Sequence, residues 1–217
     1  MTFYQLLTFI SIFIVLVPLS ISLFTIRRIA LTKVMFALLA TGLIIEIFMI
    51  NTDPDFVLRD RVFDAYCILE STLFFWIVRS RIAGLTGLGF LKSVVLFSFP
   101  LFIVSVYILP LVLKFSFSGM AIFNMAYEIV ISFYAGVELL RLIEEKRDPL
   151  AAPFFWVVLG IFFYCFSTFF IMSLLYSGIS FSIWYVNNII NIITYLMYSY
   201  GLWKGRSFKQ TPSSTHV

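Results

Sequence analysis

The stretch V-F-D-A-Y-C-I-L-E-S-T-L-F-F-W-I-V-R, from Val62 to Arg79, decides how the rest of the chain is interpreted. It is long and apolar enough to cross a bilayer, yet it carries Asp64 near one end and Glu70 close to its middle. A carboxylate at the centre of a membrane helix costs roughly 2.5–3.5 kcal/mol on insertion scales. Other polar groups must compensate for Glu70, and their positions indicate where a functional site lies.

Composition sets the fold class around this stretch. Of 217 residues, 62% are hydrophobic and 12% are charged, against roughly 25% charged in soluble domains. The apolar runs are continuous, whereas a β-barrel alternates apolar and polar residues in segments of about ten. The sequence therefore predicts an all-α, polytopic protein of the lipid bilayer, which in a bacterial cell would be the inner membrane.

Hydropathy predicts seven membrane spans within a transmembrane domain of residues 1–203. The polar tail of residues 204–217 is predicted to be disordered. No basic residue precedes Arg27, so the first span lacks the n-region of a cleaved signal peptide and is expected to stay in the protein. The predicted spans are 3–26, 34–50, 62–79, 92–114, 119–141, 154–176 and 181–203.

The basic residues predict the orientation of these spans. Twelve of the fifteen Lys and Arg residues fall at one set of span ends, leaving Arg59, Arg61 and Lys114 at the other. Because cytoplasmic loops carry the excess of basic residues, the N-terminus is predicted outside and the C-terminus in the cytoplasm. This pattern also accounts for the net charge of +4 without nucleic-acid binding.

The strongly polar side chains fall on one side of the predicted bilayer. Counted from the external span ends at ~1.5 Å per residue, Glu70, Glu128 and Asn191 lie roughly 13–15 Å deep, near the midplane of a core about 30 Å thick. Glu46 and Asn187 lie roughly 7–11 Å deep by the same count. The cytoplasmic half is nearly free of such groups. This one-sided layer predicts a pocket that opens to the outside.

The predicted pocket combines acids, amides and tyrosines from five spans. No basic side chain is expected at the depth of the acids, so they are either protonated or face a cationic or hydrogen-bond-donating ligand. The alternative for each amide and hydroxyl is a helix–helix hydrogen bond, worth about 0.6 kcal/mol on average. The predicted ligand-binding residues are Glu46, Tyr66, Glu70, Glu128, Tyr164, Asn187 and Asn191.

Missing residue types argue against several enzyme classes. The single histidine, His216, lies in the tail, so the predicted spans lack the histidine ligands that an intramembrane zinc hydrolase needs. A retinal-binding protein needs a lysine inside the last span. Lys204 lies at the cytoplasmic end of that span, which argues against this class. Cys67 and Cys165 are interpreted as small core residues, and no metal or cofactor is predicted. We therefore expect that the protein is not an enzyme. The alternative is a hydrolase that uses Asp64 and Glu70.

Three strings, L-E-S-T-L-F-F (69–75), P-F-F-W-V-V-L-G-I-F-F-Y (153–164) and N-N-I-I-N-I-I-T-Y-L-M-Y (187–198), resemble a group of small, uncharacterised bacterial seven-helix integral membrane proteins. Genes of that group sometimes lie near sensor kinases, so the resemblance implies signalling. Its motifs assign no role to a residue.

Together these features predict a seven-helix sensor or receptor-like protein that binds a small polar or cationic ligand from outside. The 144–153 loop and the tail would then contact a cytoplasmic signalling partner. One alternative is a small-solute or proton-coupled carrier that uses a buried glutamate. Another is an assembly subunit without a ligand.

Overall fold

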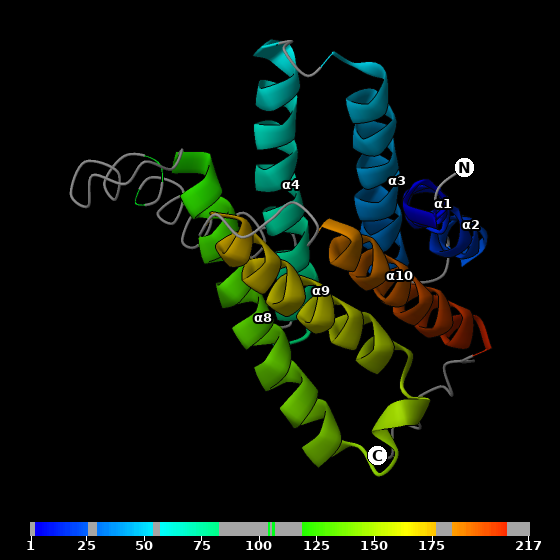
Figure 1. The fold of residues 1–217 in the computed structure, drawn as a ribbon. Helices are drawn as coiled ribbons and strands as arrows, with labels where there is room; N and C mark the ends of the chain where they lie inside the picture. The colour runs from blue at the N-terminus through cyan, green and yellow to red at the C-terminus, as the bar shows by residue number, and fades with distance from the viewer. Residues whose placement is uncertain are drawn as a thin grey trace, which may run out of the picture.

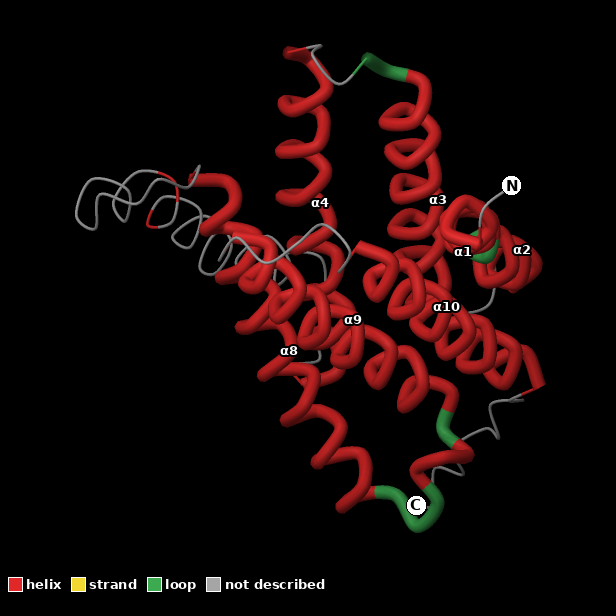
Figure 2. The backbone as a smooth tube through the Cα atoms, viewed as in Figure 1, coloured by secondary structure: helices red, strands yellow, loops and turns green. Residues whose placement is uncertain are grey.

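The computed structural model describes residues 3–25, 30–53, 57–82, 104, 106, 119–176 and 184–207. Every regular element among them is a helix, as the backbone in Figure 2 shows. The elements are α1 (Phe3–Phe13), α2 (Leu16–Thr25), α3 (Ala30–Asn51), α4 (Val57–Ile82), α8 (Gly119–Glu145), the 3-10 turn η3 (Pro149–Ala151), α9 (Pro153–Tyr176) and α10 (Trp184–Ser207).

Four helical segments are long and apolar enough to cross a membrane: Gln5–Thr25, Leu31–Asn51, Met120–Glu145 and Pro153–Leu175. Helices α4 and α10 have 26 and 24 residues and so have the length, but they are more polar. Large apolar side chains lie on the outer surface, including Phe24 (78% exposed) and Phe133 (75%). The prediction of an all-helical protein is confirmed for the described residues, and four of its helical segments are suited to cross a membrane.

The count of seven spans goes beyond what the described helices show. The predicted fourth span, 92–114, lies outside the described residues apart from 104 and 106, as does the tail from 208 onward. Several helix boundaries differ from the predicted spans by three to five residues, two of them at charged segments. Helix α4 begins at Val57, five residues before the predicted span, so the charged segment with Arg59 and Arg61 is helical. Helix α10 continues to Ser207, past the predicted limit at 203.

The first predicted span, 3–26, is divided into α1 and α2. Pro18 explains the break, because it has no N–H to donate to the carbonyl of Ile14. That carbonyl instead accepts a tighter bond from the N–H of Val17, at 3.0 Å. The chain therefore turns between Phe13 and Leu16, which sets α1 at an angle to α2 (Figure 1).

Helix α9 lies at the centre of the described bundle, packed against both α8 and α10 (Figure 1). Helix α4 contacts α8 and α3, and α1 and α2 contact α10. The α9–α10 contact is close because of Gly160: a Cβ there would lie 2.6 Å from Cε1 of Tyr198. Gly160 is thus a close-packing position, as small residues are in membrane helix pairs.

One hydrogen-bond acceptor ties the connection between α8 and α9 to α10. The carbonyl of Leu150 accepts from the indole N–H of Trp156 at 2.9 Å and from Nζ of Lys204 at 2.7 Å. The Trp156 ring also packs edge-on against Tyr200, with ring centroids 4.7 Å apart. The end of α10 and the α8–α9 connection therefore form one unit.

Candidate functional site

A cavity of about 340 Å³ lies among six helices, α1, α3, α4, α8, α9 and α10. Ligand-binding cavities span roughly 300–1,000 Å³, so this one has the size for a small molecule.

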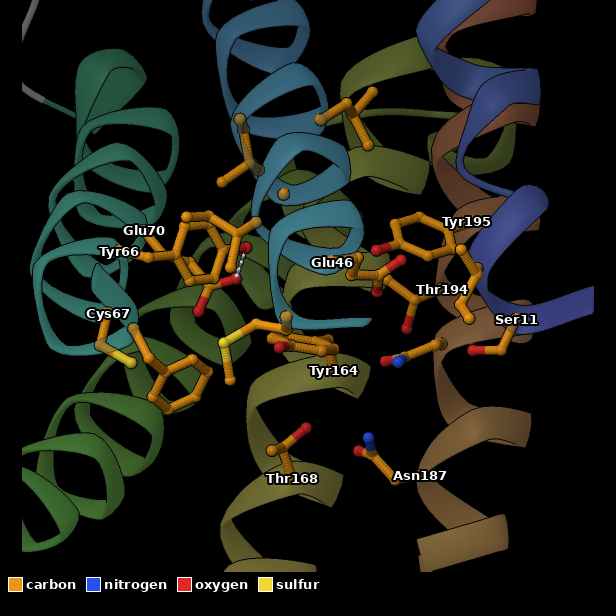
Figure 3. A pocket seen from close by; sticks show the side chains of 18 of the residues that line it. Ser11, Glu46, Tyr66, Cys67, Glu70, Tyr164, Thr168, Asn187, Thr194 and Tyr195 are labelled. Carbon is orange, nitrogen blue, oxygen red and sulfur yellow. Dashed lines mark hydrogen bonds between the residues drawn. The ribbon is translucent and has the colours of Figure 1, made fainter. Parts of the chain in front are cut away.

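All seven residues predicted from the sequence line this cavity. They come from five helices, and Figure 3 shows several of their side chains converging on the same space. Whether they bind a ligand stays a prediction. By helix, they are Glu46 on α3, Tyr66 and Glu70 on α4, Glu128 on α8, Tyr164 on α9, and Asn187 and Asn191 on α10.

Glu70 is held by two tyrosine hydroxyls. The hydroxyl of Tyr66 donates to Oε1 at 2.7 Å, shown as the dashed line in Figure 3, and that of Tyr127 donates to Oε2 at 2.6 Å. Glu70 itself is 5% exposed. Tyr66 lies one helical turn before Glu70 on α4, whereas Tyr127 comes from α8. The carboxyl therefore joins two helices while it faces the cavity.

Two more carboxyls, Glu46 and Glu128, face the same space. Both lie close enough to Glu70 for their charges to interact. Figure 3 shows Glu46 on the same side of the view as Tyr195 and Thr194 of α10. Three carboxyls around one small cavity cannot all be ionised without a counter-charge. The inner cavity therefore holds protons or attracts a cation.

The cavity wall concentrates buried polar atoms that the protein leaves unpaired. In the described part of the chain, ten buried side-chain polar atoms lack a hydrogen-bond partner, and eight of them belong to lining residues. Folded proteins leave few such atoms, so their clustering around one cavity requires groups inside it, either water or a ligand, to bond them. The eight are Glu46 Oε2, Arg59 Nε, Asn124 Oδ1, Glu128 Oε2, Thr168 Oγ1, Asn187 Oδ1, Thr194 Oγ1 and Tyr198 Oη.

Arg59 places one positive charge in the cavity wall, outside the depth of the acids, where no basic side chain was expected. It lines the cavity, and its Nε is buried. Arg59 precedes the predicted span 62–79, but α4 begins at Val57 and carries Arg59 on its first turn. The signal available in the sequence was the 3.6-residue period: Arg59, Phe63, Tyr66 and Glu70 recur at helical spacing.

The first helix also contributes to the site, which the sequence analysis missed. Thr8 and Ser11 of α1 line the cavity. Nδ2 of Asn188 on α10 donates to Oγ1 of Thr8 at 3.1 Å, so the two helices are joined at this level. Hydroxyls in apolar spans usually bond their own helix, so Thr8 and Ser11 gave no distinctive signal.

Exposure shows which end of the cavity reaches the surface. At the α3–α4 end, the lining residues Ile50 and Phe63 are 62% and 37% exposed. At the opposite end, Leu38, Phe74 and Tyr198 are all buried. Leu38 and Ile50 are twelve residues apart on α3, or roughly 18 Å at the helical rise. Among the described lining residues, the cavity thus has an exposed mouth and a buried floor.

The remaining candidate groups take other positions. Asp64 does not line the cavity, so Asp64 and Glu70 do not form a shared pair there. Cys67 and Cys165 are both buried and free, and only Cys67 lines the cavity. The described residues contain no group of three or more His, Cys, Asp or Glu placed to hold a metal.

Comparison with known protein families, curated proteins and solved structures gives no match to this chain.

Proposed function

We propose that this chain is a seven-helix sensor or receptor-like membrane protein that binds a small polar or cationic ligand in the cavity among α1, α3, α4, α8, α9 and α10. The observation that carries the proposal is the group of eight buried, unpartnered polar atoms around one cavity. A helix interface built only for packing pairs such atoms within itself, because each unsatisfied buried group costs about 1–3 kcal/mol.

The proposed orientation places the cavity mouth outside the cell. The positive-inside pattern puts the α3–α4 connection on the external face, and the exposed lining residues Ile50 and Phe63 belong to that end. The buried floor at Leu38 and Tyr198 separates the cavity from the cytoplasmic side. One-sided access favours a receptor, since a carrier needs access from both faces.

The proposed signal passes through α10. Its first half lines the cavity from Asn187 to Tyr198, and its second half reaches Lys204, which holds the Leu150 carbonyl. A ligand that shifts α10 therefore also moves the α8–α9 connection. In the proposed orientation that connection and the tail face the cytoplasm, where a signalling partner would contact them.

A thermal-shift screen of the purified protein against small polar molecules tests the proposal. A ligand at 100 times its Kd adds about 2.7 kcal/mol of stability, or several degrees in Tm for a chain of this size. The shift should fall in Glu70→Gln and Asn191→Ala and persist in Glu145→Gln, an exposed carboxyl outside the cavity. Equal shifts in all three variants would show that binding occurs elsewhere.

A proton-coupled carrier is the second candidate, and buried Glu70 is the observation that favours it. Two tyrosines hold this carboxyl beside the cavity, and intramembrane carboxyls are common proton-coupling sites. Reconstituted vesicles separate the two functions. Substrate uptake that Glu70→Gln abolishes would replace the receptor proposal, whereas binding without flux would support it.

A further inference from the structure

The unpartnered atoms of the cavity differ in what they can bond. Carboxyl and amide oxygens accept hydrogen bonds, and the hydroxyls of threonine and tyrosine accept or donate. Nε of Arg59 can only donate, and a guanidinium stays charged at any ordinary pH. Arg59 is also the one positively charged residue among the described residues that line the cavity. The wall is therefore chemically asymmetric.

This asymmetry follows the axis of the cavity. Arg59 lies on the first turn of α4, four residues before the exposed Phe63 and at the mouth. Glu70 lies eleven residues further along the same helix, or roughly 16 Å at ~1.5 Å per residue. Glu46 lies one helical turn inward from Ile50 on α3. The positive group is thus at the entrance, and the carboxyls are deeper.

Arg59 at the mouth and the carboxyls deeper in the cavity do not form ion pairs with each other. Within the described residues, the ion pairs are those of Arg141 with Glu138 and Glu145, and neither involves Arg59 or a cavity carboxyl. Charges in a partly desolvated place gain from an opposite charge nearby. A guest with a negative end and a positive end would satisfy both, with its negative end at Arg59 and its positive end among Glu46, Glu70 and Glu128.

We infer that the ligand is a small zwitterion, with a carboxylate or phosphate that Arg59 binds at the mouth and an ammonium group that the inner carboxyls bind. This inference rests on the proposed function and narrows its ligand class. A guanidinium suits this role because its planar donors match the two oxygens of a carboxylate.

Matched probes test the inference on the purified full-length protein. The first set is 4-aminobutyrate, n-butylamine and butyrate, which share a chain but carry both charges, only the positive one or only the negative one. A second set, from glycine to 6-aminohexanoate, varies the distance between the charges. Binding is measured by calorimetry for the wild type, Arg59→Gln, Arg59→Lys and Arg61→Gln. Arg61 is the control, because it is exposed on the same helix and does not line the cavity.

At least one aminocarboxylate should bind 10-fold or more tightly than its matched amine or acid. Arg59→Gln should weaken that probe about 10- to 100-fold and leave the amine unchanged, since only the bond to the negative end is lost. Arg59→Lys should retain part of the preference, and Arg61→Gln all of it. Retained amine binding in Arg59→Gln shows that this variant folds.

Two other outcomes overturn the inference in different ways. If the amine binds as tightly as the aminocarboxylates and Arg59→Gln changes nothing, the ligand is a simple cation. The zwitterion inference then fails while the cavity remains a binding site. If none of the probes binds the wild-type protein, the zwitterion inference fails, and the thermal-shift screen decides the proposed function separately.

Discussion

Two tyrosines offer the sharpest test of the site, because the same substitution should act in opposite directions. Tyr127 and Tyr198 are 1% and 2% exposed, and both line the cavity. The Tyr127 hydroxyl donates to Oε2 of Glu70 at 2.6 Å. The Tyr198 hydroxyl is buried with no partner among the described residues. Replacing either tyrosine with phenylalanine removes one oxygen and keeps the ring.

The magnitudes follow from the hydrogen bonds. Tyr127→Phe removes a short bond and leaves Oε2 of Glu70 unsatisfied, a loss of about 0.5–1.5 kcal/mol if Glu70 is neutral and about 1.5–3 if it is ionised. Bonds within membrane proteins average about 0.6 and reach about 1.7 kcal/mol. We therefore expect Tyr127→Phe to lower the free energy of unfolding by about 1–2 kcal/mol. Tyr198→Phe removes an unsatisfied hydroxyl, so it should leave stability unchanged or raise it by up to about 1 kcal/mol.

Unfolding in mixed micelles with increasing denaturing detergent measures both variants, followed by the fluorescence of the four tryptophans. Combining Tyr127→Phe with Glu70→Gln in a double-mutant cycle isolates the bond between the two side chains. The reasoning is refuted if Tyr198→Phe destabilises as much as Tyr127→Phe, because the Tyr198 hydroxyl would then have a partner.

Two further predictions use pairs of like residues. Gly160→Ala should destabilise the protein by about 1–3 kcal/mol through overpacking, because its Cβ would lie 2.6 Å from Tyr198. Gly136→Ala is the matched control, because its Cβ would lie 3.4 Å from the ring of Phe162. It should leave stability unchanged or raise it by up to about 1 kcal/mol. Unfolding midpoints compare the two, and equal losses would contradict the packing argument. Cys67 lines the cavity and Cys165 lies in the core, so a small cationic thiol reagent added outside should label Cys67 first. Mass spectrometry reads the sites, and preferential labelling of Cys165 would contradict the proposed mouth.

Helical spacing explains why so much of the site could be predicted. On α10, Asn187, Asn191, Thr194 and Tyr198 recur every three or four residues within an apolar segment, and all four line the cavity. Lipid cannot satisfy such groups, so they must turn toward other helices. The same reasoning placed Glu70 on the inner face of α4. Polar side chains in a membrane segment therefore indicate both the depth of a site in the bilayer and the helix face that turns toward the other helices.

The features that escaped prediction depend on tertiary structure. Arg59 reaches the cavity because α4 continues past its apolar part to Val57, and hydropathy ends a span where charges begin. The kink between α1 and α2 comes from Pro18, whose effect on a membrane helix depends on which neighbours satisfy the freed carbonyl. The position of Thr8 at the cavity depends on the packing of α1 against α10, where Asn188 donates a hydrogen bond to it.

The unpaired polar wall also bears on how long the molecule survives. On the proposed function, a bound guest bonds these groups and adds stability as its concentration rises above Kd. Quality control removes membrane proteins in proportion to their unfolded fraction. On the proposed function, the amount of this protein in the cell therefore rises with the concentration of its ligand. That dependence is separate from any signal that the bound protein sends.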